Sequence, residues 1–229
     1  MIERKFIENK VKEYKIKSYL KEKFVNAGYS SAEIEKTPLG LKIKINTSKP
    51  GIIVGKGGKN IAEMTRLLKK KFKLESPQLE VNEVMEPELD ANIMAERIVY
   101  QIKRFGKTRF KAIGYNTLRR IMKAGAVGAE VVISGRIPGK RHKTWRFKEG
   151  RLPKNGHVAN DLVDKGFKDI QWKQGSVGVK VNILSPYIKT PDQFNIIKTP
   201  EKVQSEEVSA HGDTKEEEDK RVKQKRIKK

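Results

Sequence analysis

A short glycine-rich segment carries the residues best suited to holding a phosphate group. Residues 55–58 read Gly-Lys-Gly-Gly, and Lys59 follows directly. Glycines have no side chain, so they let a backbone approach a nucleic-acid strand closely. The N–H groups at the start of a helix favour an anion, and two lysines add full positive charge. The pattern predicts a phosphate grip formed by Gly55, Lys56, Gly57, Gly58 and Lys59.

The residues on either side of this loop predict two helices that hold it in place. Pro50 suits a first helical position because it has no N–H to leave unpaired. Residues 52–54, Ile-Ile-Val, then predict a short buried helical turn. After the loop, one helical face carries Ile61, Met64, Thr65, Leu68 and Phe72. A Walker-type phosphate loop does not fit, because its glycines are spaced further apart and Asn60, not Ser or Thr, follows the lysine.

The loop and its two helices resemble the GXXG element of a KH domain, which clamps the backbone of about four single-stranded nucleotides. Residues 1–27 show apolar positions at helical spacing in two successive pieces, and residues 31–36 and 41–45 predict two strands joined by a turn. Residues 79–81 mark a third strand. The order helix, two strands, helix, GXXG, helix, strand is that of a type-2 KH domain, with its core over about residues 15–85. The alternative is a glycine-rich turn between two core helices.

The charge of the chain points to a polyanionic partner. Its 229 residues include 51 Lys and Arg against 28 Asp and Glu, a formal net charge of +23. The first 188 residues hold 40 of the basic and 19 of the acidic residues, so the excess belongs to the part expected to fold. Between Arg97 and Arg151 there are 16 basic residues, and only Glu130 and Glu149 oppose them. Nucleic acid is therefore the first candidate partner.

The composition also argues against several other functions. The chain has no cysteine, so it forms no disulfide, thiolate nucleophile or cysteine-ligated zinc site. Its three histidines, His142, His157 and His211, show no metal-ligand spacing. No apolar run approaches the length of a membrane span, and the N-terminus lacks the apolar centre of a signal peptide. We expect a cytoplasmic protein with no cofactor, no metal, no membrane association and no small-molecule substrate.

Residues 88–188 predict two helices on a small sheet. The first helix spans residues 88–105 and places on one face Met94, Ile98, Ile102 and Phe105. The second helix is expected to point four side chains into the core, namely Phe110, Ile113, Thr117 and Ile121. Strands are predicted at residues 126–135, 143–148 and 177–183, and the aromatic pair Trp145 and Phe147 of the middle strand is expected in the core. Gly114 within the second helix costs about 1 kcal/mol relative to alanine. Close packing or a close approach to RNA would explain it, and the alternative is a chance substitution with no structural cause.

These elements predict an α+β protein in three parts. Residues 1–86 hold the N-terminal helix and the type-2 KH domain, and residues 87–188 form a compact C-terminal α/β domain. Residues 189–229 are rich in Thr, Pro, Glu, Lys and Gln. Such a segment buries too little apolar surface to offset the entropy of ordering, so we expect a charged, disordered tail.

Several short stretches, taken in order, resemble the motifs of one protein family. They are residues 51–61, 88–91, 134–136 and 175–181, and residues 145–153 strengthen the match. The family is that of the universal small-subunit ribosomal protein three, in the head of the small ribosomal subunit. The resemblance covers about residues 1–188, and the order of the motifs is more specific than any one of them. Residues 114–115 and 120–122 are more similar to its archaeal and eukaryotic branch than to its bacterial one.

The resemblance implies a structural ribosomal protein that binds small-subunit rRNA and contacts neighbouring proteins of the head. It also implies a position near the path by which mRNA enters. In this family a basic pair early in the second helix of the C-terminal domain faces incoming mRNA. Here Lys111 matches one position of the pair, and Ala112 stands at the other.

We expect the rRNA and mRNA contacts to come from exposed cations of the C-terminal domain. The candidates are Lys103, Arg104, Lys107, Arg109, Lys111, Arg119, Arg120, Arg136, Arg141, Lys143, Arg146 and Arg151. Phosphate neutralisation should supply affinity that falls steeply with salt, while the folded scaffold sets the register on the RNA.

Two other functions compete with the ribosomal one. The first is a free KH-type regulator that binds single-stranded mRNA outside the ribosome. The second is an enzyme that cleaves damaged nucleic acid through a Schiff base on a lysine of depressed pKa. The sequence singles out no such lysine, so we expect no catalytic activity.

Overall fold

Two β-sheets organise the part of the chain that the structure describes. The computed structural model describes residues 2–25, 27–37, 40–74, 76–137, 139, 141–172, 175–188 and 190. Within these residues, a three-stranded sheet belongs to the N-terminal half and a four-stranded sheet to the C-terminal half. The predicted tail, residues 189–229, falls almost entirely outside the described residues.

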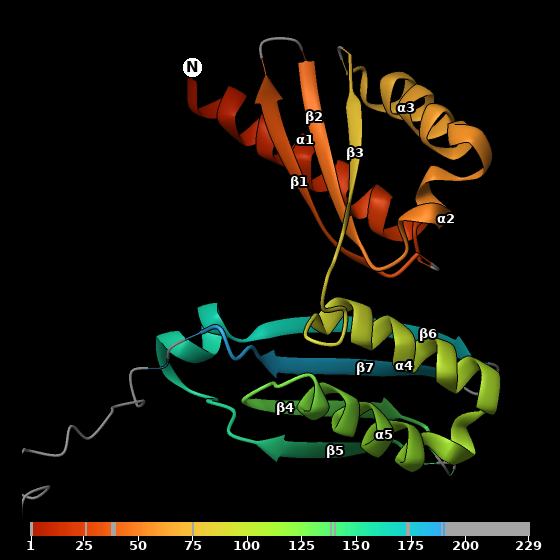
Figure 1. The fold of residues 1–229 in the computed structure, drawn as a ribbon, viewed down its shortest axis with the longest axis vertical. Coiled ribbons are helices and arrows are strands. Elements are labelled where there is room, and N and C mark those ends of the chain that lie inside the picture. Colours follow the sequence, from red (N-terminus) through yellow and green to blue (C-terminus); the bar gives the residue numbers. More distant parts are fainter. Residues whose placement is uncertain are drawn as a thin grey trace, which may run out of the picture. The chain divides into compact units, whose positions relative to one another are not determined.

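The N-terminal half has the element order of a type-2 KH domain (Figure 1). Its elements are α1 (Ile2–Lys23), β1 (Tyr29–Thr37), β2 (Gly40–Thr47), α2 (Pro50–Val54), η1 (Lys56–Gly58), α3 (Lys59–Phe72) and β3 (Gln78–Glu83). Strand β2 lies in the centre of the sheet, antiparallel to β1 and parallel to β3. The helices pack on the sheet through Ile16, Leu20, Ile43, Ile45, Ile53 and Leu68, all nearly inaccessible to solvent. The predicted KH topology is confirmed.

Two details of this half differ from the prediction. Helix α1 is one continuous helix rather than two pieces, because residues 2–23 contain no Gly or Pro to interrupt it. Its buried residues are Ile16 and Leu20 alone. In α2, Ile53 is buried, but Ile52 is 47% exposed rather than part of a buried turn.

The C-terminal half places two helices on one face of an antiparallel sheet. Its elements are α4 (Ala91–Phe105), η2 (Lys107–Arg109), α5 (Phe110–Lys123), β4 (Gly128–Gly135), β5 (Lys143–Gly150), η3 (Val158–Leu162), β6 (Asp164–Trp172) and β7 (Gly175–Leu184). The strand order is β5-β4-β7-β6. Helix α4 runs along β6 and β7, and α5 along β4 and β5 (Figure 1). The core between the helices and the sheet includes Met94, Ile98, Ile102, Ile121, Val131, Val179 and Val181.

The sequence did not reveal strand β6 or the turn η3 before it. The side of β6 that faces α4 carries Asp164, Gly166, Lys168, Ile170 and Trp172, so no apolar alternation marks the strand. Helix α4 begins at Ala91 rather than at residue 88, and Phe105 at its end is 49% exposed rather than buried.

The start of α4 is fixed by two aspartates and one glycine. Asp90 caps the helix, because its Oδ1 accepts hydrogen bonds from the N–H groups of Asn92 (2.8 Å) and Ile93 (3.0 Å). Asp164 Oδ2 on β6 accepts one from the Ala91 N–H at 2.7 Å. Beside it, a Cβ on Gly166 would lie 2.1 Å from the Ala91 carbonyl oxygen. Backbone therefore meets backbone here, which only glycine permits.

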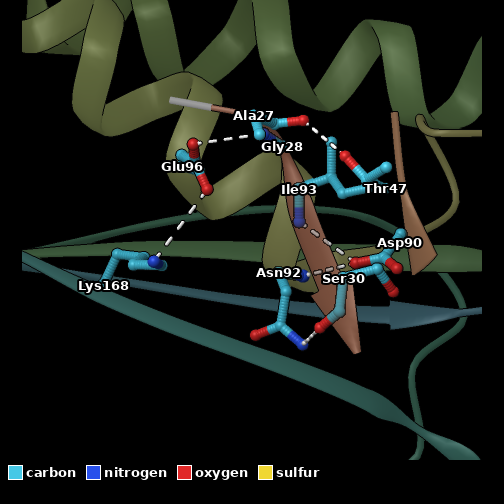
Figure 2. A network of polar contacts seen from close by, with 9 residues as sticks. All are labelled: Ala27, Gly28, Ser30, Thr47, Asp90, Asn92, Ile93, Glu96 and Lys168. Atoms are coloured by element: carbon cyan, nitrogen blue, oxygen red, sulfur yellow. Dashed lines mark hydrogen bonds and ion pairs between the residues drawn. The ribbon is translucent and has the colours of Figure 1, made fainter. Parts of the chain in front are cut away.

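Helix α4 also contacts β1 and the turn before it through polar groups. Figure 2 shows Glu96 of α4 between the Gly28 N–H and the Lys168 ammonium. Glu96 Oε1 accepts from the Gly28 N–H at 3.4 Å, and its Oε2 lies 3.9 Å from Lys168 Nζ. Asn92 Nδ2 donates to the Ser30 carbonyl at 3.3 Å. The buried Glu96 carboxylate of α4 thus lies between the turn before β1 and strand β6.

Gly114 in α5 has a packing explanation. It is buried, and a Cβ at this position would lie 2.7 Å from two ring carbons of Phe147 on β5. Phe147 is itself 5% exposed, and Trp145 packs against the same core, as predicted for this pair.

The close approach at Gly166 predicts a large effect of a single methyl group. We expect Gly166→Ala to lower the free energy of unfolding by about 1–3 kcal/mol, because the Ala91 backbone must move away. Gly51→Ala is the control, because Gly51 is exposed within α2 and no described heavy atom lies near an added Cβ. The free energy of unfolding of this variant should be unchanged or higher by up to about 1 kcal/mol. Urea unfolding followed by circular dichroism measures both. Equal stability of the two variants would contradict the packing described.

The buried Glu96 predicts a pH dependence. Burial raises the pKa of Glu96 above its ordinary 4.5, opposed by Lys168 and the Gly28 N–H. The folded state therefore holds this proton more tightly than the unfolded chain. The resulting stabilisation is complete below pH 4.5 and is lost as pH rises through the folded-state pKa.

Glu96→Gln removes this titration and keeps an oxygen for the Gly28 N–H. We expect the wild-type chain to lose stability relative to this variant between pH 4.5 and neutrality, measured by urea unfolding at a series of pH values. A stability difference that stays constant over this range would show that the carboxyl has no raised pKa.

Candidate nucleic-acid interface

The predicted phosphate grip forms a tight, exposed turn between α2 and α3. Gly55, Gly57 and Gly58 all have positive φ values, of 70°, 61° and 74°. At Gly55 the ψ of −178° completes a conformation essentially limited to glycine. Lys56 and Lys59 are exposed at the two ends of the 3₁₀ turn η1. The structure therefore brings all five predicted residues of the grip together.

The side chain of Asn60 stabilises this turn. Its Nδ2 donates to the Ile52 carbonyl at 3.0 Å, which ties the first turn of α3 to α2. A Cβ on Gly55 would lie 2.5 Å from the Asn60 side chain, so the loop closes over that amide. The turn is thus supported before any ligand binds.

The electrostatics of the turn favour an anion. The N-cap of α3 is Gly58, which has no side chain to accept from the first N–H groups, and the first turn of the helix holds no acidic residue. Lys56 and Lys59 lie at this same end. The Lys59 N–H is used within the turn, because it donates to the Lys56 carbonyl. The positive end of the α3 dipole and two exposed ammonium groups therefore lie together, an arrangement suited to a phosphate.

The predicted cations of the C-terminal half fall into separate groups. Lys103 and Arg104 end α4, and Arg109 and Lys111 precede or begin α5. Arg119 and Arg120 lie on the outer side of α5. The remaining exposed cations are on β5 and the segments around it, namely Arg136, Arg141, Lys143, Arg146 and Arg151. The side chain of Lys107 is outside the described part of the structure.

Lys111 is the best-positioned of these cations. Its ammonium lies 4.8 Å from the centre of the Trp145 ring, which itself packs 5.2 Å from Phe110. This cation–π contact holds an exposed charge in place at the start of α5. Ala112 beside it is also exposed, so the second position of the family's basic pair lacks a charge.

Sequence reasoning missed two residues that belong to these surfaces. Ile52 is exposed next to the loop and offers an apolar contact there. Tyr115 is 57% exposed, and its ring meets the Phe147 ring edge-on with centres 4.9 Å apart. Tyr115 stands four residues after Lys111 and four before Arg119, so the helical spacing was the signal that could have revealed it.

Three observations bear on metal binding, membrane insertion and lysine chemistry in the described part of the chain. In the described part of the chain, no group of three or more His, Cys, Asp or Glu side chains could hold a metal ion. No described helix is long and apolar enough to cross a membrane. Burial lowers the pKa of Lys168, but its side chain is 12% exposed and lies against Glu96, so it does not face a substrate.

Comparison with known families identifies both halves of the chain. A KH domain matches residues 15–89, and the C-terminal domain of ribosomal protein S3 matches residues 98–183. The fold and the loop therefore define a KH-domain protein that carries the S3 C-terminal domain.

Curated relatives extend this match to most of the chain. Small ribosomal subunit protein uS3 of Methanoculleus marisnigri is 38% identical over 208 residues, which cover 90% of this chain and 88% of the relative. The uS3 protein of Halobacterium salinarum is 39% identical over 194 residues, 85% of this chain and 64% of the relative. The chain belongs to the uS3 family of small ribosomal subunit proteins, and the predicted archaeal likeness is confirmed. It spans just under two thirds of the length of the haloarchaeal relatives.

A charge reversal in the loop tests whether RNA affinity depends on the positive charge of the loop rather than on its backbone conformation. We expect Lys56→Asp with Gly57→Asp to weaken binding to a single-stranded fragment of small-subunit rRNA by roughly tenfold or more. Asp tolerates the left-handed conformation of Gly57, and no described atom crowds a Cβ there. Filter binding measures the affinity.

The matched control is Lys56→Gln with Gly57→Asn, which makes the same demand on the backbone without negative charge. The two double variants should have the same thermal midpoint, while the neutral one retains most of the affinity. Equal RNA affinity of the aspartate variant and the wild-type chain would remove the phosphate-grip assignment.

Proposed function

We propose that this chain is a structural component of the small ribosomal subunit that binds rRNA in the head and helps to line the path by which mRNA enters. Its partners are small-subunit rRNA, incoming mRNA and neighbouring head proteins, and its place is in cytoplasmic ribosomes. It has no catalytic role. The observation that carries this proposal is the exposed, preformed loop of residues 55–58 in a chain of the uS3 family.

The loop supplies one RNA contact. The N-terminal end of α3 and two exposed lysines suit a phosphate, and exposed Ile52 offers apolar surface for a base beside it. Because the turn is held by Asn60, binding does not have to order it first. This supports a grip on single-stranded RNA by Gly55, Lys56, Gly57, Gly58 and Lys59.

The cations of the C-terminal half supply the second contact. Lys111, Arg119 and Arg120 lie on the exposed side of α5, and Lys103, Arg104 and Arg109 lie near its start. Helix α5 is the element that faces mRNA in the family that the sequence resembles. We assign rRNA or mRNA contacts to these residues and to Lys107, Arg136, Arg141, Lys143, Arg146 and Arg151.

The match to the S3 C-terminal domain favours the ribosomal role over a free regulator. We place the boundary between the two domains at residues 86–87, in the connection between β3 and α4. A free regulator would need only the first of them.

Salt dependence tests the contribution of α5. We expect Lys111→Gln to reduce the slope of log affinity against log salt by about 1 for small-subunit rRNA, because one phosphate contact is lost. Ala112→Gln is the matched control, since it places the same side chain on the neighbouring exposed position without removing a charge. An unchanged slope in Lys111→Gln would exclude this lysine from the interface.

Sedimentation distinguishes the two cellular roles. A ribosomal protein should sediment almost entirely with small subunits at moderate salt, whereas a free regulator should remain near the top of the gradient. Chemical probing of reconstituted small subunits, with and without the chain, should then show protections in the head. Absence of the chain from purified subunits would overturn the proposed function.

A further inference from the structure

One face of the four-stranded sheet has no described helix on it. Alternate residues of β4 and β7, including Val131, Ile133, Val179 and Val181, point into the core under α4 and α5. The residues between them therefore point to the other side, which we call the open face. Its residues are Glu130, Val132 and Ser134 of β4, Thr144, Arg146 and Lys148 of β5, Lys165, Phe167, Asp169 and Gln171 of β6, and Ser176, Gly178, Lys180 and Asn182 of β7.

Phe167 is an exposed aromatic residue on this largely polar face. Its side chain is 57% exposed, whereas the other aromatic residues of these strands, Trp145, Phe147 and Trp172, lie in the core or pack against it. Its neighbour across the strand pair is Lys180. A Cβ on Gly178 would lie 3.6 Å from Cε2 of the ring, so the phenyl group lies beside a glycine and keeps its other side accessible.

A hollow adjoins this ring. It has a volume of about 740 Å³ and opens to solvent between β6, β7, β4 and the start of β5. Besides Phe167, it is lined by hydroxyl, carboxylate, imidazole and ammonium groups of Ser134, His142, Lys143, Thr144, Asp169 and Ser176. This volume lies in the range of roughly 300–1,000 Å³ that is usual for ligand pockets, and the lining offers both donors and acceptors.

The charges of the open face favour a nucleic acid as its occupant. Arg146, Lys148, Lys165 and Lys180 are exposed on it. Of its two carboxylates, Glu130 is 6% exposed and its Oε1 accepts from Lys154 Nζ at 2.9 Å, so its charge is compensated.

Asp169 is the remaining carboxylate and lines the hollow beside Phe167. A phosphate would be repelled there. The amino group of a base would instead find an acceptor. The position of this acid therefore suits a base in the hollow with its phosphates over the surrounding cations.

From this arrangement we infer that the open face binds an unpaired nucleobase, stacked on Phe167 and inserted into the adjoining hollow, with its strand held by Lys165, Lys180 and Arg146. This inference rests on the proposed RNA-binding function and adds a second single-strand site distinct from the loop of residues 55–58. Stacking on an aromatic ring tolerates any base, and Asp169 favours bases that carry an amino group.

The test measures stacking apart from charge. The full-length chain carries Lys56→Asp with Gly57→Asp, so that the loop does not mask the second site. Affinity is measured for a short cytosine-rich oligoribonucleotide and for the same strand with abasic positions. In this background Phe167→Leu should lower the affinity for the intact strand by roughly tenfold and leave the salt slope unchanged, because stacking involves no counterion release.

Four comparisons sharpen the result. Phe167→Tyr keeps a stacking ring and should retain the affinity, whereas Lys165→Gln with Lys180→Gln should reduce the salt slope. Tyr100→Leu is the matched control, because Tyr100 is an equally exposed aromatic residue on α4, at 60% exposure. For the abasic strand, Phe167→Leu should make no difference.

The outcomes separate this inference from the proposed function. If the wild-type chain fails to bind rRNA, the proposed function falls, and this inference falls with it. If the wild-type chain binds rRNA but Phe167→Leu matches its parent on the intact strand, the second site alone is overturned. It is also overturned if Phe167→Leu binds RNA normally while Phe167→Asp is excluded from small subunits, because that pair of results assigns the open face to a protein neighbour.

Discussion

The close contact between the start of α4 and strand β6 is the constraint on which the C-terminal half depends. Gly166 lets the Ala91 backbone reach the strand, and Asp90 and Asp164 satisfy the N–H groups that the helix leaves unpaired at this end. Once α4 is fixed there, Glu96 lies one turn further along and reaches the Gly28 N–H near β1. A single helix thus determines both the packing of the four-stranded sheet and its contact with the KH domain.

The distribution of charge follows a related rule. Two acidic residues, Glu96 and Glu130, are buried and used to join elements, one to Gly28 and Lys168 and the other to Lys154. By contrast, the described cations of α5 and the loop at residues 55–58 are exposed. The two buried carboxylates therefore serve the fold together with Lys168 and Lys154, whereas the cations of α5 and of the loop remain exposed. A chain with this arrangement suits an RNA-rich assembly, where phosphates supply the missing counter-charge.

The sequence predicted most of this fold because its signals are local. Apolar positions at helical or alternating spacing placed α3, α5, β2 and β7, and the glycines at residues 55–58 marked the turn between α2 and α3. Strand β6 could not be predicted from the sequence, because its buried side holds two residues that do not look like core residues. Gly166 is required by a backbone contact, and Lys168 pairs with Glu96 of α4. Both residues are explained by partners far away in the sequence. The same holds for Phe167, whose exposure depends on which face of the sheet the helices cover.

The first half of α1 leaves a large apolar surface uncovered in the described structure. Helix α1 has 22 residues, a length of about 33 Å, but its buried residues are Ile16 and Leu20. Ile2, Phe6 and Ile7 are 87%, 62% and 60% exposed. An isolated copy therefore exposes an apolar projection, a surface of the kind through which proteins self-associate.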